Sequence, residues 1–137
     1  MKTLAKTGST RRPKSGRERG QELVEYALVF PLLMLLVLGI IEFGVVIFSF
    51  NTIANAAREG ARCGIIPGTD LEVCRSLAEE RALSLDPAAL QVNATRSEST
   101  VQVEVLYDAH LLTAPIVQAL GGNPTLPLRA ISTMYIE

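Results

Sequence analysis

Residues 27–50 read ALVFPLLMLLVLGIIEFGVVIFSF and form the longest apolar run of the chain. Among its residues only Glu42 is charged. An α-helix rises ~1.5 Å per residue, so the stretch would be ~36 Å long, which exceeds the ~30 Å hydrocarbon core of a bilayer. The stretch therefore predicts one membrane-spanning helix.

A secretory signal peptide is the main alternative explanation of the apolar stretch. The apolar region of a signal peptide is usually ~7–15 residues long, which is shorter than this one. Ala54-Asn55-Ala56 nevertheless offers an A-x-A cleavage pattern, and cleavage there would leave Ala57 as the first residue. Length favours the membrane helix, and the two explanations predict different mature N-termini.

The formal net charge of −1 hides a strong asymmetry along the chain. Residues 1–20 carry seven basic residues and one acidic residue, a net charge of +6, whereas residues 21–137 carry six basic and 13 acidic residues, a net charge of −7. Basic residues before an apolar segment are retained in the cytoplasm, so the acidic remainder should be exported. A basic segment can also bind nucleic acid, but Pro13, Ser15 and Gly16 would interrupt a groove-reading helix. We therefore expect no nucleic-acid partner.

The helical pattern continues beyond the membrane segment. We expect one helix over about residues 22–63, apolar all round in its first half and amphipathic in its second half. In the second half, Ala56, Gly60 and Gly64 recur every four residues, and such small side chains let another element approach the backbone closely. Pro31 has no N–H to donate and should kink the helix near its start.

A second helix is expected after the long one. Thr69 and Glu72 have the spacing of a capping box, with Thr69 as the N-cap, so the helix should begin there. It should continue through about Leu85 and stop at Pro87. Its apolar face would consist of Leu71, Cys74, Leu77, Ala78 and Leu85.

Three segments in the rest of the chain read as strands, namely residues 89–96, 100–107 and 126–136. The second alternates between an apolar face and a polar face, as a half-buried strand does. Residues 109–119 read as a brief helix or a loop interrupted by Pro115. The apolar face of the second strand consists of Val101, Val103, Val105 and Tyr107, opposite Gln102 and Glu104.

Together these elements predict an α+β fold. A long N-terminal helix would cross the membrane, become amphipathic, and pack on a small antiparallel sheet beside a second helix. The predicted organisation is a basic leader at residues 1–20, the long helix at residues 21–63 and a small exported head at residues 64–137.

Two cysteines, Cys63 and Cys74, follow the apolar stretch and lie in the part expected to be exported. An oxidising compartment favours a disulfide between them, although two separate buried thiols would also fit the sequence. The bridge would close a short loop and stabilise a small core. No further Cys or His nearby would complete a zinc site.

The junction between the leader and the apolar stretch, residues 20–26, reads GQELVEY. A basic leader ending in Gly20, then a carboxylate at Glu25 and an aromatic ring at Tyr26, resembles the processing site of type IV prepilins, in particular those of the tight-adherence (Tad) pilus. Further runs resemble the TadE-like family of Tad pseudopilins. These runs are Glu25-Tyr26-Ala27-Leu28, Pro31-Leu32-Leu33, Gly39-Ile40-Ile41-Glu42-Phe43-Gly44 and Asn55-Ala56-Ala57-Arg58-Glu59-Gly60-Ala61-Arg62.

The resemblance implies a pilin-like fold and a structural role as a pseudopilin, a minor pilin or a filament-forming pilin. It implies cleavage after Gly20 by an inner-membrane prepilin peptidase, which would make Gln21 the first residue. The implied partners are other pilin subunits (copies of this chain or Flp/TadF-like chains), membrane lipid before assembly and, indirectly, an assembly ATPase and membrane platform proteins. The implied location is the bacterial inner membrane, with the N-terminus in the cytoplasm, followed by the pilus at the cell surface.

Three residues are candidates for a role in assembly. Cleavage would create a cationic amine on Gln21, and Glu25 lies one helical turn away, where it could neutralise the amine in its own chain or in a neighbour and so set axial register. An acid near a helix N-terminus is also favoured by the helix dipole alone. Glu42 would contact another subunit, or else reach the lipid headgroups. Pro31 would lend flexibility during assembly, or else be merely tolerated in a membrane helix.

The sequence gives no sign of an enzyme. It has no phosphate-binding glycine loop, metal cluster or paired acids, so neither a cofactor nor a metal is expected. His110 is the sole histidine and reads as a surface residue, and the sequon Asn93-Ala94-Thr95 is uninformative. The alternative function is a single-pass, membrane-anchored extracytoplasmic binding protein that retains Met1.

Overall fold

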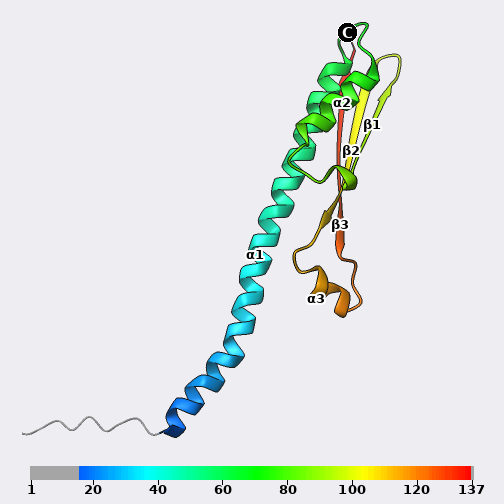
Figure 1. Cartoon of the computed structure of the whole chain (residues 1–137). Coiled ribbons are helices and arrows are strands. Elements are labelled where there is room, and N and C mark those ends of the chain that lie inside the picture. Colours follow the sequence, from blue (N-terminus) through cyan, green and yellow to red (C-terminus); the bar gives the residue numbers. More distant parts are fainter. Residues whose placement is uncertain (1–15, 137) are drawn as a thin grey trace, which may run out of the picture. The chain divides into compact units, whose positions relative to one another are not determined.

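The computed structural model describes residues 16–136, with side chains described from Gly20 onward. Most of the predicted leader therefore lies outside the described residues. Within the described range the chain forms three α-helices, one short 3-10 helix and three strands (Figure 1). The chain divides into two compact units between Val37 and Leu38, and each unit is described by itself.

Helix α1, Gly16–Gly64, forms the described part of the first unit and continues into the second. It begins before the predicted residue 22, because residues 17–19, Arg-Glu-Arg, have favourable helix propensities and extend the helix toward the leader. The helix continues through Pro31 without interruption. Among the described residues it is the one helix long and apolar enough to cross a membrane.

Helix α2, Leu71–Arg81, departs from the prediction at both ends. Its N-cap is Asp70 rather than Thr69, because the Asp70 carboxylate accepts a hydrogen bond from the Glu72 N–H at 3.3 Å. At the other end the chain leaves the helix at Ala82, whose N–H bonds back to the Glu79 carbonyl. The predicted end at Leu85 is therefore wrong. Leu85 still reaches the core, because the chain turns back toward the sheet.

The turn after α2 leads through a 3-10 helix, η1 at Pro87–Ala89, into a three-stranded antiparallel sheet. Its strands are β1 (Leu90–Arg96), β2 (Thr100–His110) and β3 (Thr125–Tyr135), with β2 in the centre. The predicted α+β fold is thus confirmed. β3 forms one edge of the sheet and contains a proline, Pro127, opposite Asp108.

The β2–β3 connection contains helix α3, Ala114–Ala119. Pro115 does not interrupt this segment, as the sequence suggested, but lies in the first turn of α3, where its missing N–H removes no helical hydrogen bond. In Figure 1, α3 lies at the end of the β2–β3 hairpin, away from α2.

One face of the sheet carries the core of the second unit. Val103 in β2 pairs with Ala94 on one side and Ser132 on the other, and the alternation predicted for β2 places its valines on the buried face. The C-terminal part of α1 and α2 cover this face (Figure 1). The buried cluster consists of Ile53, Ala56, Ala57, Ala61, Ala78, Ala82, Leu85, Val92, Val101, Val103, Val105 and Ala130.

The small residues of α1 permit this packing. A Cβ on Gly60 would lie 3.1 Å from both Ala78 Cβ and Val103 Cγ1. A Cβ on Gly64 would lie only 2.5 Å from Val101 Cγ1. The predicted close approach therefore occurs, and the element that approaches α1 belongs to the chain's own head.

Candidate processing and assembly sites

The GQELVEY segment lies within α1, in the first unit. A Cβ added to Gly20 would meet nothing within 4 Å among the described residues. Glu25 follows Gln21 by four positions on the same helix, as predicted. Glu25 is exposed and Tyr26 is 73% exposed. The side chains of the segment are thus accessible to a partner. Its backbone is in the α-helical conformation.

The apolar run on α1 is open as well. Only 6% of its most apolar window is buried within the chain. An exposed apolar surface of this size is unfavourable in water and marks a contact surface for a membrane or for another protein. The large apolar side chains exposed between residues 23 and 36 are those of Leu23, Val24, Tyr26, Leu28, Val29, Phe30, Leu32, Leu33, Met34, Leu35 and Leu36.

Glu42, the one charge in the apolar run, contacts its own chain. Its carboxylate accepts hydrogen bonds from the Thr113 hydroxyl at 2.7 Å and from the Thr113 N–H at 3.2 Å. Thr113 is the N-cap residue of α3, and its own side chain caps no other N–H. Glu42 therefore completes the cap of a helix 71 positions further along the chain. The sequence prediction included neither this contact nor Thr113.

The less exposed positions of α1 in the second unit form one stripe along the helix. They begin at Glu42, continue at Val46, Ser49 and Ile53, and reach Gly64 at intervals of three or four residues. This spacing places them on one helical face. The head therefore follows α1 into its apolar run rather than contacting the amphipathic part alone.

Cys63 and Cys74 lie at disulfide distance, with Cα atoms 5.4 Å apart and 11 positions apart in sequence. The bridge joins the last turn of α1 to the first turn of α2. Because Cys74 is fully buried, it also contributes to the core. The structure thus brings together the two residues that the sequence pairs.

Arg96, at the end of β1, closes the C-terminus of α1. Its guanidinium donates to the carbonyl of Gly64, the last residue of α1, and to the carbonyl of Thr69 at 3.3 Å. A cation at this position satisfies unpaired carbonyls and complements the helix dipole. The role of Arg96 could not be predicted from the sequence, because the contact joins residues 32 positions apart.

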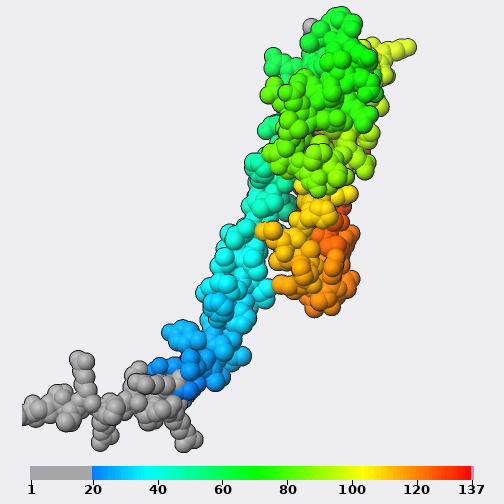
Figure 2. Space-filling model, viewed as in Figure 1, coloured from blue at the N-terminus to red at the C-terminus, as the bar shows by residue number. Residues whose placement is uncertain are grey.

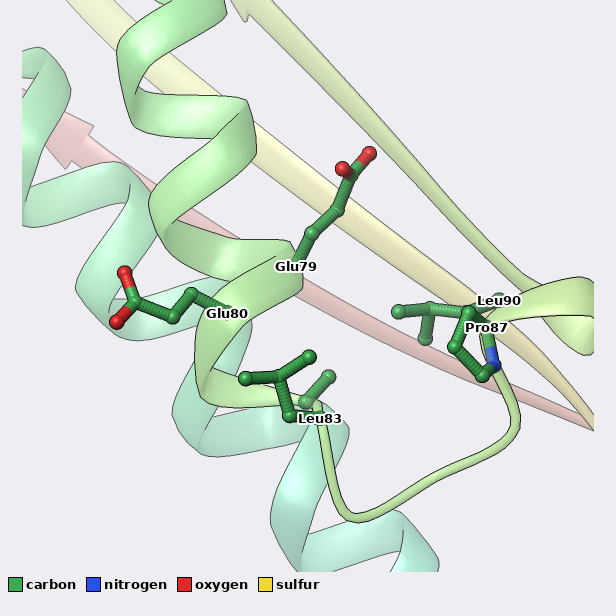
Figure 3. A pocket seen from close by; sticks show the side chains of 6 residues that line it. Glu79, Glu80, Leu83, Pro87 and Leu90 are labelled. Atoms are coloured by element: carbon green, nitrogen blue, oxygen red, sulfur yellow. The ribbon is translucent and has the colours of Figure 1, made fainter.

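A surface pocket lies between α2 and the start of the sheet and is lined by Glu79, Glu80, Ala82, Leu83, Pro87 and Leu90. Figure 3 shows that the carboxylates of Glu79 and Glu80 point away from each other. Glu79 also accepts a hydrogen bond from Arg75 at 3.1 Å. The two acids therefore do not form a converging pair. Within residues 16–136 no three His, Cys, Asp or Glu side chains are grouped so as to hold a metal.

A comparison with protein families matches residues 20–62 to the model of the TadE-like protein family. The matched residues include Gly20, Glu25, Glu42, Ala56 and Gly60, and they end just before Cys63. The expected resemblance is confirmed over this segment and associates the chain with structural proteins of the Tad pilus. No curated protein and no solved structure matches the chain.

Proposed function

We propose that this chain is a structural subunit of a Tad-type pilus, a pseudopilin or minor pilin, and not an enzyme. The observation that carries the proposal is the TadE-like match over residues 20–62 together with the exposed apolar surface of α1. Lipid would cover this surface before assembly, and the helices of neighbouring subunits would cover it in a filament. One helix then serves as membrane anchor and later as assembly surface.

In this proposal, maturation begins with cleavage after Gly20 by a prepilin peptidase. Gly20 has no side chain to obstruct the peptidase, and its surroundings are open. Since the bond lies within α1, the peptidase must first unwind the adjoining helical turn. Turns near a helix N-terminus lack some hydrogen-bond partners and open readily. Cleavage leaves a cationic amine on Gln21.

Glu25 would then pair with that amine, in its own chain or in a neighbour. An amine that enters an apolar filament core without a partner would be strongly unfavourable, because desolvating an unpaired charge is costly. Pairing with a neighbour fixes one subunit against the next along the filament axis. The other partners of assembly would be further pilin subunits, an assembly ATPase and membrane platform proteins.

The mature N-terminus tests the proposal directly. We expect the full chain, coexpressed with a prepilin peptidase, to begin at Gln21 by intact mass and N-terminal sequencing. Gly20→Leu should block this cleavage, whereas the control Gly39→Leu should not. The two variants are matched, because a Cβ at either glycine meets nothing within 4 Å and neither disturbs packing. A chain that keeps Met1 would favour the membrane-anchored binding protein, and one that begins at Ala57 would favour a secreted domain.

Glu25 provides a second test, which separates processing from assembly. We expect Glu25→Ala to be cleaved normally but to be depleted from isolated pili, because the new amine loses its partner. Glu25→Asp, which keeps the carboxylate, is the matched control and should be incorporated. Normal incorporation of Glu25→Ala would rule out the role of Glu25 in axial register.

A further inference from the structure

The connection between β2 and β3 is apolar, although loops at a protein surface are usually polar. We call residues 111–124 the apolar loop. No Asp, Glu, Lys, Arg or His occurs from residue 111 to residue 128. Leu112, Ile116 and Leu120 are 58%, 44% and 84% exposed, and Leu126, at the start of β3, is 40% exposed. Such a cluster, unlike a single exposed leucine, indicates a contact surface.

Hydrogen bonds at both ends of α3 hold the apolar loop in place. At the N-terminal end of α3, Glu42 holds Thr113 through two hydrogen bonds. At the C-terminal end, the Gly122 N–H donates to the Val117 carbonyl at 2.8 Å, in a Schellman motif. Gly121 has a φ of +79°, and a Cβ on Gly122 would come within 2.7 Å of Val117 Cγ1, so both positions favour glycine. The loop is therefore fixed at both ends of α3.

The apolar loop lies beside the apolar run of α1. The residue of α1 that contacts the loop is Glu42. It lies eight positions, or ~12 Å of helix, before Phe50, the last residue of the apolar run. Figure 2 shows the atoms of the loop (orange) next to those of α1 (cyan) at this level. On the same stretch of α1, Phe43 and Ile47 are 67% and 45% exposed. Exposed apolar side chains therefore occur both on the loop and on the adjacent stretch of α1.

Because Glu42 contacts the loop, the depth of the loop in a membrane depends on where the span of α1 ends relative to Glu42. A span needs ~20 residues, and residues 22–41 meet this length, with two carboxylates, Glu22 and Glu25, in its first turn. The loop then lies at the membrane boundary. If the span instead ended at Phe50, the loop would lie ~12 Å deeper. The first placement keeps Glu42 and the charged residues of the sheet out of the hydrocarbon. It leaves Glu22 and Glu25 in the first turn of the span, beside the headgroups, where a carboxylate costs less than it does ~12 Å deep.

We propose that the apolar loop is a second membrane contact, in which α3 lies at the headgroup boundary of the leaflet facing the head, and that the span of α1 ends near Ile41. The proposal rests on α1 being the membrane anchor and is independent of processing and assembly. Lipid is the favoured occupant because the anchor holds the loop at a high effective concentration beside the bilayer. Interfacial segments of this kind bind through shallow burial of apolar side chains.

The chain contains no tryptophan, so a single introduced one reports on its own surroundings. We would insert Leu120→Trp, in the full chain, into phosphatidylcholine–phosphatidylglycerol vesicles with lipids brominated near the headgroup. The expected result is a blue-shifted emission that the brominated lipid quenches. Tyr135→Trp, at the opposite end of β3 and 77% exposed in the parent chain, is the matched control and should be neither shifted nor quenched.

Leu36→Trp, within the apolar run, reports whether α1 is inserted at all. Quenching of Leu36→Trp without quenching of Leu120→Trp would overturn the loop proposal and leave the anchor intact. Loss of quenching in both would overturn the anchor, and with it the membrane part of the proposed function. A blue shift of Leu120→Trp that appears only as the protein-to-lipid ratio rises would assign the loop to contacts between copies of the chain, against the proposal.

Discussion

The head holds α1 in two regions that are built differently. In the distal contact, residues 53–64 of α1, small apolar residues are fully buried against the sheet and α2, and the Cys63–Cys74 pair joins the two helices. In the proximal contact, residues 42–49, burial is limited and the principal bond is that between Glu42 and Thr113. The distal contact excludes water, whereas the proximal contact depends on one carboxylate.

This difference separates two tasks. The distal contact resembles the core of a folded domain, where packing is close and volume changes are costly. The proximal contact rests on hydrogen bonds, which contribute a net ~1–3 kcal/mol when one partner is charged. We therefore expect changes in the distal contact to unfold the head, and changes in the proximal contact to release α3 while the head stays folded.

The largest effect is expected from the cysteine pair. Replacing both residues, as Cys63→Ser with Cys74→Ser, should lower the free energy of unfolding by about 3 kcal/mol, because a loop of this length loses its constraint on the unfolded chain. Thermal unfolding of the full chain in detergent, followed by circular dichroism, measures the change. Dithiothreitol should destabilise the parent chain to a similar extent and leave the double variant unchanged. A parent chain indifferent to reductant would contradict the bridge.

A somewhat smaller effect is expected at the closest approach between α1 and the sheet. Gly64→Ala places a Cβ 2.5 Å from Val101 Cγ1 and should cost about 2 kcal/mol of stability through overpacking. Gly44→Ala is the control on the same helix, where the Cβ meets nothing within 4 Å, and it should cost nothing. Adding Val101→Ala to Gly64→Ala should recover part of the loss. Equal stability of the two glycine variants would refute the close contact.

The smallest effect is expected in the proximal contact, and it should be local. Glu42→Ala leaves the Thr113 N–H without its acceptor and should destabilise α3 by about 1 kcal/mol, the usual cost of a lost cap. Amide hydrogen exchange in α3 should then accelerate about fivefold, with little change in the core strands. Glu42→Gln keeps an acceptor oxygen and should have a weaker effect. Equal acceleration throughout the sheet would show that the two contacts do not act separately.

The distal contact could be foreseen from the sequence, because its signals are local and repetitive. The spacing of Ala56, Gly60 and Gly64 indicates a close approach, and the alternation from Val101 to Val105 identifies the buried face of β2. Element ends were less predictable. Thr69 and Asp70 are both good N-caps, and the choice between them depends on backbone conformation at the start of α2.

The proximal contact could not be foreseen, because it depends on tertiary structure. Nothing near Glu42 in the sequence indicates that its partner is Thr113, 71 positions away. From the sequence, Glu42 was expected to meet another subunit or the lipid headgroups, and a contact within the chain was not predicted. Arg96 was missed for the same reason. Long-range polar contacts carry no periodic signal, whereas apolar faces do.

Pro127 in the edge strand β3 has a consequence for the proposed assembly of this chain with its own copies. Both edges of a three-stranded sheet carry unpaired backbone groups, which can recruit strands from other chains and lead to aggregation. A proline on an edge strand breaks the continuous row of donors that such recruitment needs. Pro127 therefore disfavours pairing between heads through the β3 edge, and in the proposed assembly the contacts between chains would then form through α1 rather than through this edge.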